Sequence, residues 1–279
     1  MTTKPIVVGT DGSEQSVRAV EWAAREAVLR GAPLRIVSAA EILPRMSEAA
    51  QPAGVETVAT HLIGERDHAL AGAARAAAAV APDLLIDTDP VDGPPAQAVT
   101  ASGSGALLLV VGSHGGGAFA AMTLGSVSRY AAVHAPCPVV VVREEAPAAD
   151  RLVAVGIRSP LDCGAALAFA FEEARLRKAA VLAVHAWQFP DSHAADRDAV
   201  ELDELLDDCR VKYPDVEASG DVVRGHPGRV LADLSARAEL VVLGRHHAND
   251  RLVPGPARVI HAVVGHAHGP VVTVPSQGA

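Results

Sequence analysis

The sequence predicts an α/β protein made of two tandem domains, each an open five-stranded parallel sheet with helices on both faces. Three observations support this prediction. The predicted strands are short, apolar and rich in valine, as strands buried in a parallel sheet are. Strand patterns alternate with helix patterns along the chain. The same order of segments occurs twice, and 279 residues is the length of two domains of ordinary size.

The repeat appears as constant shifts in the numbering. At a shift of 147 residues, Ile6–Gly9 (IVVG) aligns with Val153–Gly156 (VAVG). At a shift of 132 residues, Ala135–Val140 (APCPVV) aligns with Ala267–Val272 (AHGPVV). The difference between the two shifts places extra chain in the first copy, around residues 42–60.

Two domains are therefore predicted, at residues 1–145 and 150–279, with an alanine-rich linker over residues 144–150. In each domain, five strands alternate with four helices. The clearest strands of the first domain lie at residues 6–9, 34–37, 106–111 and 139–142.

The first helix follows the strand at residues 6–9. Ser13 or Ser16 can cap its start, and Gly31 can end it in the left-handed conformation that glycine adopts at little cost. Apolar residues at helical spacing identify the face expected to pack on the sheet. This stripe consists of Val17, Val20, Ala24, Ala27 and Val28.

Charge and composition exclude several classes of partner. The net charge of −9 and the lack of a long basic run argue against nonspecific nucleic-acid binding and against an anionic membrane surface. Cys137, Cys163 and Cys209 are odd in number and widely spaced, which indicates free thiols in a reducing compartment. The N-terminal segment lacks the layout of a signal peptide, and no run of about 20 apolar residues could span a bilayer. We therefore expect a cytoplasmic protein.

The most specific motif is a glycine-rich loop between a strand and a helix. The apolar run at residues 106–111 is followed by GSHG at 112–115, and GS stands at 125–126. The glycines of GSHG permit positive φ and a close approach of a ligand to the backbone. A helix that begins at Ser126 would direct its free N–H groups and positive dipole end into this loop, where a phosphate could bind. Ser126 and Ser128 can add hydroxyl donors.

A second segment is expected at the same crevice. Parallel α/β sheets bind ligands at the carboxyl ends of their strands, near the point where the strand order reverses. The first strand ends in GTDGS at residues 9–13 and the fourth ends at the glycine loop, so both would project into one crevice. Asp11 can serve there as a ligand contact, as a helix cap, or as both.

Other loop chemistries fit less well. A P-loop needs a lysine after its second glycine, and Lys4, Lys178 and Lys212 all lie elsewhere. A dinucleotide-binding motif would follow the first strand with G-x-G-x-x-G, but GTDGS stands there. Ser113 as a nucleophile and His114 as a general base are alternatives to a role in lining phosphates, although no G-x-S-x-G elbow surrounds Ser113.

Three segments together resemble the universal stress protein family. They are IVVGTDGS at residues 6–13, GSHG-x9-GS at 112–126 and APCPVVVV at 135–142. The resemblance covers nearly the whole chain as two tandem family domains, and the glycine spacing of the first copy matches the family's ATP-binding pattern. It implies a Rossmann-like, adenine-nucleotide-binding form of the open sandwich, with ATP as the cofactor, with or without Mg²⁺.

The resemblance also implies a site in the first domain, residue by residue. Asp11 would contact the ribose or the base, with Gly9 and Thr10 beside it, and Ala39 would pack on the adenine. The glycine loop and the start of the following helix would hold the phosphates and the ribose through Gly112, Ser113, His114, Gly115, Gly125, Ser126, Val127 and Ser128.

Family members mostly bind ATP and regulate, so the resemblance implies an ATP-binding stress-response regulator that is not an efficient enzyme. A slow ATPase and an interaction protein with a purely structural nucleotide are the alternatives. No acidic residue lies between Gly112 and Arg143 to hold Mg²⁺ near the loop, which favours binding over turnover. The family dimerises through its fifth strands, so residues 139–142 and 271–274 are expected to pair within one chain. A further homodimer would also be compatible with the family.

The second copy lacks the pattern. The positions of Asp11, Gly115, Gly125 and Ser126 are taken by Arg158, His247, Ala257 and Arg258. An imidazole would fill the volume that a phosphate needs, so we expect no ATP there in the family manner. Histidines gather near this second crevice, and we interpret them as solvated or capping residues; they are His226, His246, His247 and His261. The alternative is an anion or metal site with Arg158 and Arg258, of which an anion fits the arginines better.

Overall fold

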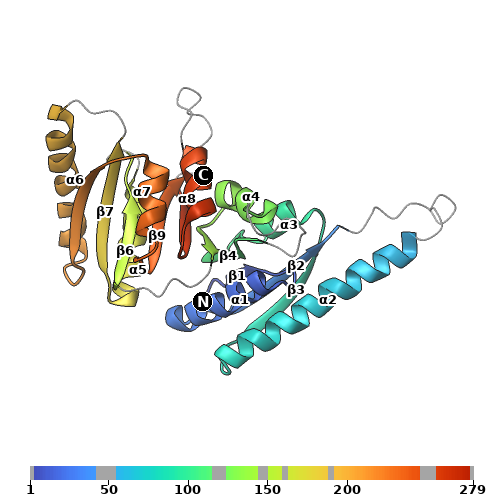
Figure 1. Ribbon diagram of the computed structural model, residues 1–279. Helices are drawn as coiled ribbons and strands as arrows, with labels where there is room; N and C mark the ends of the chain where they lie inside the picture. Colours follow the sequence, from blue (N-terminus) through green and yellow to red (C-terminus); the bar gives the residue numbers. More distant parts are fainter. Residues whose placement is uncertain are drawn as a thin grey trace. The chain divides into compact units, whose positions relative to one another are not determined.

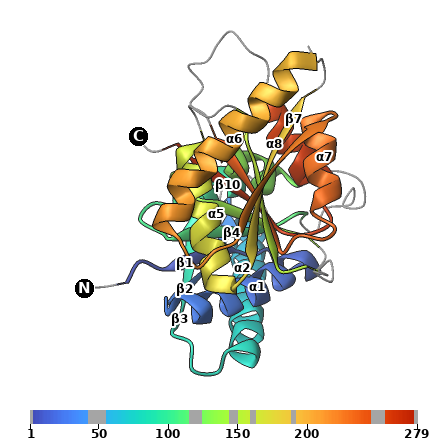
Figure 2. The same cartoon turned by 90° about the vertical axis from the view of Figure 1, so that its left-hand side faces the viewer.

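The structure, a computed structural model, describes residues 3–41, 55–114, 124–143, 150–158, 163–187, 192–245 and 256–276. The chain divides into two compact units, residues 1–137 and 138–279, and each is an α/β assembly in its own right. Figures 1 and 2 show the elements from two directions. The predicted fold class is confirmed in both units.

The first unit alternates strands and helices from its first strand onward. Its elements are β1 (Ile6–Gly9), α1 (Glu14–Arg30), β2 (Leu34–Ala40), α2 (Val55–Val80), β3 (Ile86–Asp92), α3 (Pro95–Ala101), β4 (Leu108–Gly112) and α4 (Ser126–His134). The strands are all parallel, in the order β3-β2-β1-β4. The chain moves outward from β1 to β3 and returns to β4 on the other side of β1. The reversal of strand order therefore falls between β1 and β4, where such sheets bind ligands.

Helices cover both faces of this sheet (Figure 1). α1 packs against α2, and α3 packs against α4. The central strands supply the core between these layers: Val8 lies level with Ile36 of β2 and with Val110 of β4, and all three are fully buried. Burial of three such side chains stabilises the fold by roughly 1.5–3 kcal/mol each.

The residues predicted to begin and end α1 do so in the structure. The Ser13 hydroxyl accepts a hydrogen bond from the N–H of Ser16, and Gly31 ends the helix at a φ of 60°. The predicted apolar stripe is correct at Val20, Ala24 and Ala27, which are buried, but wrong at Val28, which is 59% exposed. Val28 lies in the last turn of α1.

The second unit repeats the same order and begins with one extra strand. Its elements are β5 (Val139–Val142), β6 (Leu152–Gly156), α5 (Gly164–Arg177), β7 (Ala180–Trp187), α6 (Ser192–Lys212), β8 (Ala218–Arg224), α7 (Pro227–Leu234), β9 (Leu240–Arg245), α8 (Pro256–His266) and β10 (Val271–Pro275). The strand order is β5-β10-β9-β6-β7-β8. The last five strands are parallel, and β7 lies between β6 and β8 as β2 lies between β1 and β3.

β5 closes the first repeat in the sequence but belongs to the second unit by its contacts. It pairs with β10 in antiparallel register, with Val140 opposite Val272 and Val141 opposite Val271. All four of these valines are fully buried. The pairing satisfies the backbone groups that each apolar strand would otherwise expose at an edge. Among the helices that the structure describes, none is both long and apolar enough to cross a membrane.

Candidate functional site

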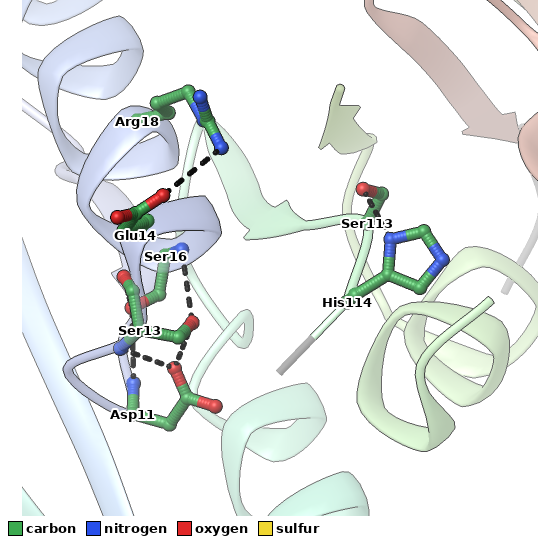
Figure 3. Close-up of polar contacts among 7 residues, drawn as sticks. All are labelled: Asp11, Ser13, Glu14, Ser16, Arg18, Ser113 and His114. Carbon is green, nitrogen blue, oxygen red and sulfur yellow. Dashed lines mark hydrogen bonds and ion pairs between the residues drawn. The ribbon is translucent and has the colours of Figure 1, made fainter. Parts of the chain in front are cut away.

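Asp11 lies in the turn between β1 and α1, where its carboxylate holds the turn in shape. Oδ1 of Asp11 accepts hydrogen bonds from the Ser13 N–H at 3.0 Å and from the Ser13 hydroxyl at 2.6 Å. The same Ser13 hydroxyl caps α1 (Figure 3). The second carboxylate oxygen points away from the turn, toward the side on which His114 lies (Figure 3). Asp11 thus combines a cap-like role with an orientation that suits contact with a ligand.

The buried hydroxyls of Thr10 and Ser16 form hydrogen bonds that hold this turn. Oγ1 of Thr10 lies 3.1 Å from Oγ of Ser16 and accepts a hydrogen bond from the N–H of Gly12. The Ser16 hydroxyl donates to the carbonyl of Ser13 at 2.8 Å. Thr10 is 6% exposed and Ser16 is 4% exposed. Ser16 thus lies beside the site, whereas its place in the sequence suggested only a capping role.

The glycine loop is held together by its own backbone and by one serine of α4. The N–H of Gly125 donates to the carbonyl of Ser113 at 2.8 Å. The hydroxyl of Ser128 donates to the carbonyl of Gly112 at 2.7 Å. Oγ of Ser113 lies 2.9 Å from Nδ1 of His114 (Figure 3). The single hydroxyl proton of Ser128 is therefore donated within the loop. Ser126 lies at the exposed start of α4, where its hydroxyl is open to a ligand.

Gly112 and Gly125 are glycines for reasons of space, which for Gly112 differs from the positive φ that its motif suggested. Neither has a positive φ; Gly12, Gly31, Gly93 and Gly105 are the described glycines that do. A Cβ on Gly112 would lie 2.9 Å from the carbonyl oxygen of Gln15, so the start of α1 packs directly on the end of β4. A Cβ on Gly125 would lie 3.3 Å from the carbonyl oxygen of Ser113. Close packing of backbone, and not a positive φ, favours glycine at these two positions, strictly at Gly112 and less strictly at Gly125.

These segments surround one cavity of about 280 Å³. Most of the predicted site residues line it, namely Gly9, Thr10, Asp11, Ala39, Gly112, His114, Gly125, Ser126, Val127 and Ser128. Ser113 is buried behind the loop and does not line the cavity, and Gly115 lies outside the described residues. The remaining lining residues were not foreseen: Ser16, Pro95, Val99 and Val111. The volume is near the lower end of the range for small-molecule sites.

The cavity has two chemically different ends. The first turn of α4, from Ser126 to Ser128, presents backbone N–H groups and the positive end of the helix dipole. Asp11 and Ala39, at the ends of β1 and β2, present a carboxylate and a small apolar surface. Such a cavity suits an elongated molecule that is anionic at one end and flat and hydrogen-bonding at the other.

The second unit does not reproduce this arrangement among its described residues. Arg158 follows β6 and is exposed, as are Ala257 and Arg258 in the first turn of α8. His226 caps α7 by accepting a hydrogen bond from the N–H of Gly228 with Nδ1, which agrees with the capping interpretation. His261 lies in α8. His246 and His247 lie outside the described residues, within which no three His, Cys, Asp or Glu side chains are grouped to hold a metal ion.

An open parallel sheet with a cavity at its switch point, bordered by a helix N-terminus, defines a doubly wound α/β protein with a ligand crevice. The family model of the Universal stress protein family matches residues 2–143 and, a second time, residues 151–275. The chain therefore belongs to the universal stress protein family, as two tandem copies, and the resemblance inferred from the sequence is confirmed.

Relatives of the same tandem length support this assignment. Universal stress protein Rv2624c of Mycobacterium tuberculosis (strain ATCC 25618 / H37Rv) is 32% identical over 283 residues, which cover 98% of this chain and 97% of the relative. Universal stress protein Rv2623 of the same strain is 34% identical over 259 residues, which cover 86% and 85%. A universal stress protein structure from Archaeoglobus fulgidus DSM 4304 shares the fold at a TM-score of 0.71 and 16% identity, over 98% of this chain and 96% of the other.

Proposed function

We propose that the first unit binds an adenine nucleotide in the 280 Å³ cavity, and that the protein is a nucleotide-dependent stress-response regulator. The observation that carries the proposal is the meeting of three chain segments around one cavity. These are the GTDGS turn after β1, the end of β4 and the start of α4. ATP, with or without Mg²⁺, is the nucleotide that the glycine spacing favours.

The chemistry of the two ends supports one orientation of the proposed ligand. Phosphate oxygens would lie at Ser126 and Val127 in the first turn of α4, because backbone N–H groups and a helix N-terminus stabilise negative charge. The base and ribose would lie at Asp11 and Ala39, since the carboxylate of Asp11 repels phosphate but accepts hydrogen bonds from hydroxyl and amino groups.

We expect regulation instead of turnover at this site. Asp11 is the only carboxylate in the described lining, and it lies at the end proposed for the base. Hydrolysis by an in-line water would call for a Mg²⁺ carboxylate at the phosphate end. Steady-state phosphate release from ATP is therefore expected to stay at background when the purified protein is saturated with nucleotide.

Substitution of Ser126 tests the proposed position of the phosphates. Ser126 is the first residue of α4 and is exposed, and a glutamate there suits the helix dipole, so Ser126→Glu is expected to fold. Its carboxylate would meet the phosphates and cost several kcal/mol of binding. We expect at least a 100-fold loss of ATP affinity by isothermal titration calorimetry.

Ser126→Gln is the matched control, because it has the same size without the charge. It is expected to retain most of the affinity. Equal ATP binding by Ser126→Glu and the native protein would show that the phosphates do not lie at α4. Mass spectrometry of the small molecule released on denaturing the purified protein would identify the nucleotide independently.

A further inference from the structure

A second cavity adjoins the first at the end proposed for the base. It has a volume of about 960 Å³ and shares three lining residues with the first: Asp11, Ala39 and Pro95. None of the residues of α4 that line the first cavity lines the second. The second cavity therefore continues past the base end and not past the phosphate end.

The further walls of this second cavity come from the end of β2 and from α2. Ser38–Glu41 form one side, and residues of α2 from Thr60 to Ala69 form the other. Asp11, Glu41 and Glu65 contribute carboxylates, and His61 lies 3.2 Å from Glu65. Charged side chains thus stand among apolar ones such as Leu62 and Ala69 around this space, unlike in a packing defect between wholly apolar surfaces.

Arg66 contributes a guanidinium group to the second cavity, and an ion pair holds its side chain at the end of β3. Its side chain is 11% exposed, and Nη1 lies 2.9 Å from Oδ1 of Asp92 at the end of β3. Nε lies 3.5 Å from the carboxylate of Asp67. With this cation held by carboxylates, the other acidic side chains give the lining an excess of negative charge. A cationic or neutral group fits this space better than a further phosphate.

Resting on the proposed function, we propose that the site takes adenine nucleotides enlarged at the base, and that the second cavity receives a neutral or cationic group attached to the base edge. A mononucleotide anchored at α4 would fill the first cavity with its base against Ala39. A substituent on the exocyclic N6 would then extend past Asp11 and Ala39 into the space beside α2. This assigns to α2 a part in selecting the ligand.

Gly64 allows the second cavity to be blocked without disturbing the first. Gly64 lies in α2 and lines the second cavity, and a Cβ added to it would meet nothing within 4 Å. Replacing glycine within a helix also removes the large loss of backbone entropy that glycine undergoes on folding. Gly64→Phe is therefore expected to fold and to reduce the open volume. Gly72→Phe is the matched control, because Gly72 is in the same helix, lines neither cavity and has only the tip of Arg75 nearby, at 3.9 Å.

The test compares AMP with N6-(6-aminohexyl)-AMP by isothermal titration calorimetry on the full chain. The native protein is expected to bind the two ligands with affinities within about threefold. Gly64→Phe is expected to weaken the enlarged ligand at least tenfold and to leave AMP within twofold, and Gly72→Phe is expected to change neither. A nucleotide enlarged at the ribose, 2′/3′-O-(N-methylanthraniloyl)-AMP, is expected to be insensitive to Gly64→Phe.

Charge gives a second, independent measurement. N6-hexyl-AMP lacks the terminal amine, and we expect it to bind about two- to fivefold more weakly than the aminohexyl ligand, as a partly exposed charge pair would allow. Glu65→Gln is expected to reduce that difference. Glu172→Gln, an exposed position on α5 of the second unit, is the control and is expected to leave the difference unchanged.

The outcomes separate the two proposals. If AMP binds but the native protein rejects N6-(6-aminohexyl)-AMP by tenfold or more, the enlarged site is disproved and the nucleotide site is retained. The same holds if Gly64→Phe affects the ribose-linked ligand and spares the N6-linked one. If AMP, ADP and ATP all fail to bind the native protein, the proposed function fails and this inference fails with it.

Discussion

Glu26 and Arg30 form a buried ion pair on α1, one helical turn apart. Nε of Arg30 lies 2.7 Å from Oε1 of Glu26, and the two side chains are 14% and 4% exposed. The second repeat has the same pair at the shift of 147 residues, between Glu173 and Arg177 of α5. A carboxylate taken out of water needs such a partner, because its desolvation is otherwise uncompensated. The pair thus recurs where each repeat packs its first helix.

Removing one partner of this pair is expected to destabilise the first unit strongly. Arg30→Ala removes the cation that lies 2.7 Å from the buried Glu26 carboxylate, and loss of one partner of a buried pair costs about 3–5 kcal/mol. Urea denaturation, followed by circular dichroism, would measure the loss as a lower transition midpoint. Arg18→Ala is the control, because Arg18 and Glu14 form an exposed pair at 3.8 Å and should cost at most about 1 kcal/mol. Equal effects of the two substitutions would contradict the importance of burial.

Gly112→Ala is expected to affect stability and binding together. The added methyl group would lie 2.9 Å from the backbone of Gln15, so α1 and β4 must move apart. Overpacking of this kind costs about 1–3 kcal/mol, and the shift would separate the two segments that line the cavity. Denaturation and ATP titration would show the two losses. Gly164→Ala is the control, since nothing lies within 4 Å of an added Cβ there, and it is expected to be neutral or stabilising.

The parts of the fold that sequence predicts well are those set by local pattern. Apolar runs such as residues 106–111 predict buried strands because a parallel sheet hides both faces of each strand. Ser13 and Gly31 predict the ends of α1 because caps act on adjacent backbone groups. The residues at strand ends follow from the strands, which is why Asp11 and His114 were expected at one crevice and line one cavity.

The parts that sequence does not predict depend on contacts between elements. Pro95 and Val99 line the cavity because α3 returns over the sheet, a geometry that no local pattern specifies. Gly112 is required by the approach of α1, although its place in a glycine-rich motif suggested backbone freedom. Glu26 is buried, although a charged residue on a helix usually faces solvent. The one sequence feature that indicates this burial is Arg30, the arginine four residues later.

The two serines of α4 are expected to separate stability from binding. Ser128→Ala removes the hydrogen bond to the Gly112 carbonyl, which should cost about 1 kcal/mol of stability because a partly buried acceptor loses its donor. Ser126→Ala should leave stability unchanged and weaken ATP binding by about 1 kcal/mol, the net contribution of one hydrogen bond. Thermal denaturation without ligand and ATP titration would give the two quantities for each variant. The reverse pattern would show that Ser128, not Ser126, faces the ligand.

Cys209 is expected to react slowly with thiol reagents at neutral pH. Burial raises the pKa of the Cys209 thiol, the nearby carboxylate of Asp208 raises it further, and Lys212 partly opposes them. A raised pKa means a smaller thiolate fraction at any given pH, so the rate of alkylation by iodoacetamide should rise only above the pH at which an ordinary cysteine reacts. Mass spectrometry of the modified peptide would follow the rate against pH and distinguish Cys209 from the buried Cys137 and Cys163. Asp208→Asn should move the profile part of the way to lower pH, because burial, the larger cause, stays in place. Lys212→Gln should move it to higher pH, and a profile that neither variant moves would show that the thiol does not sense these charges.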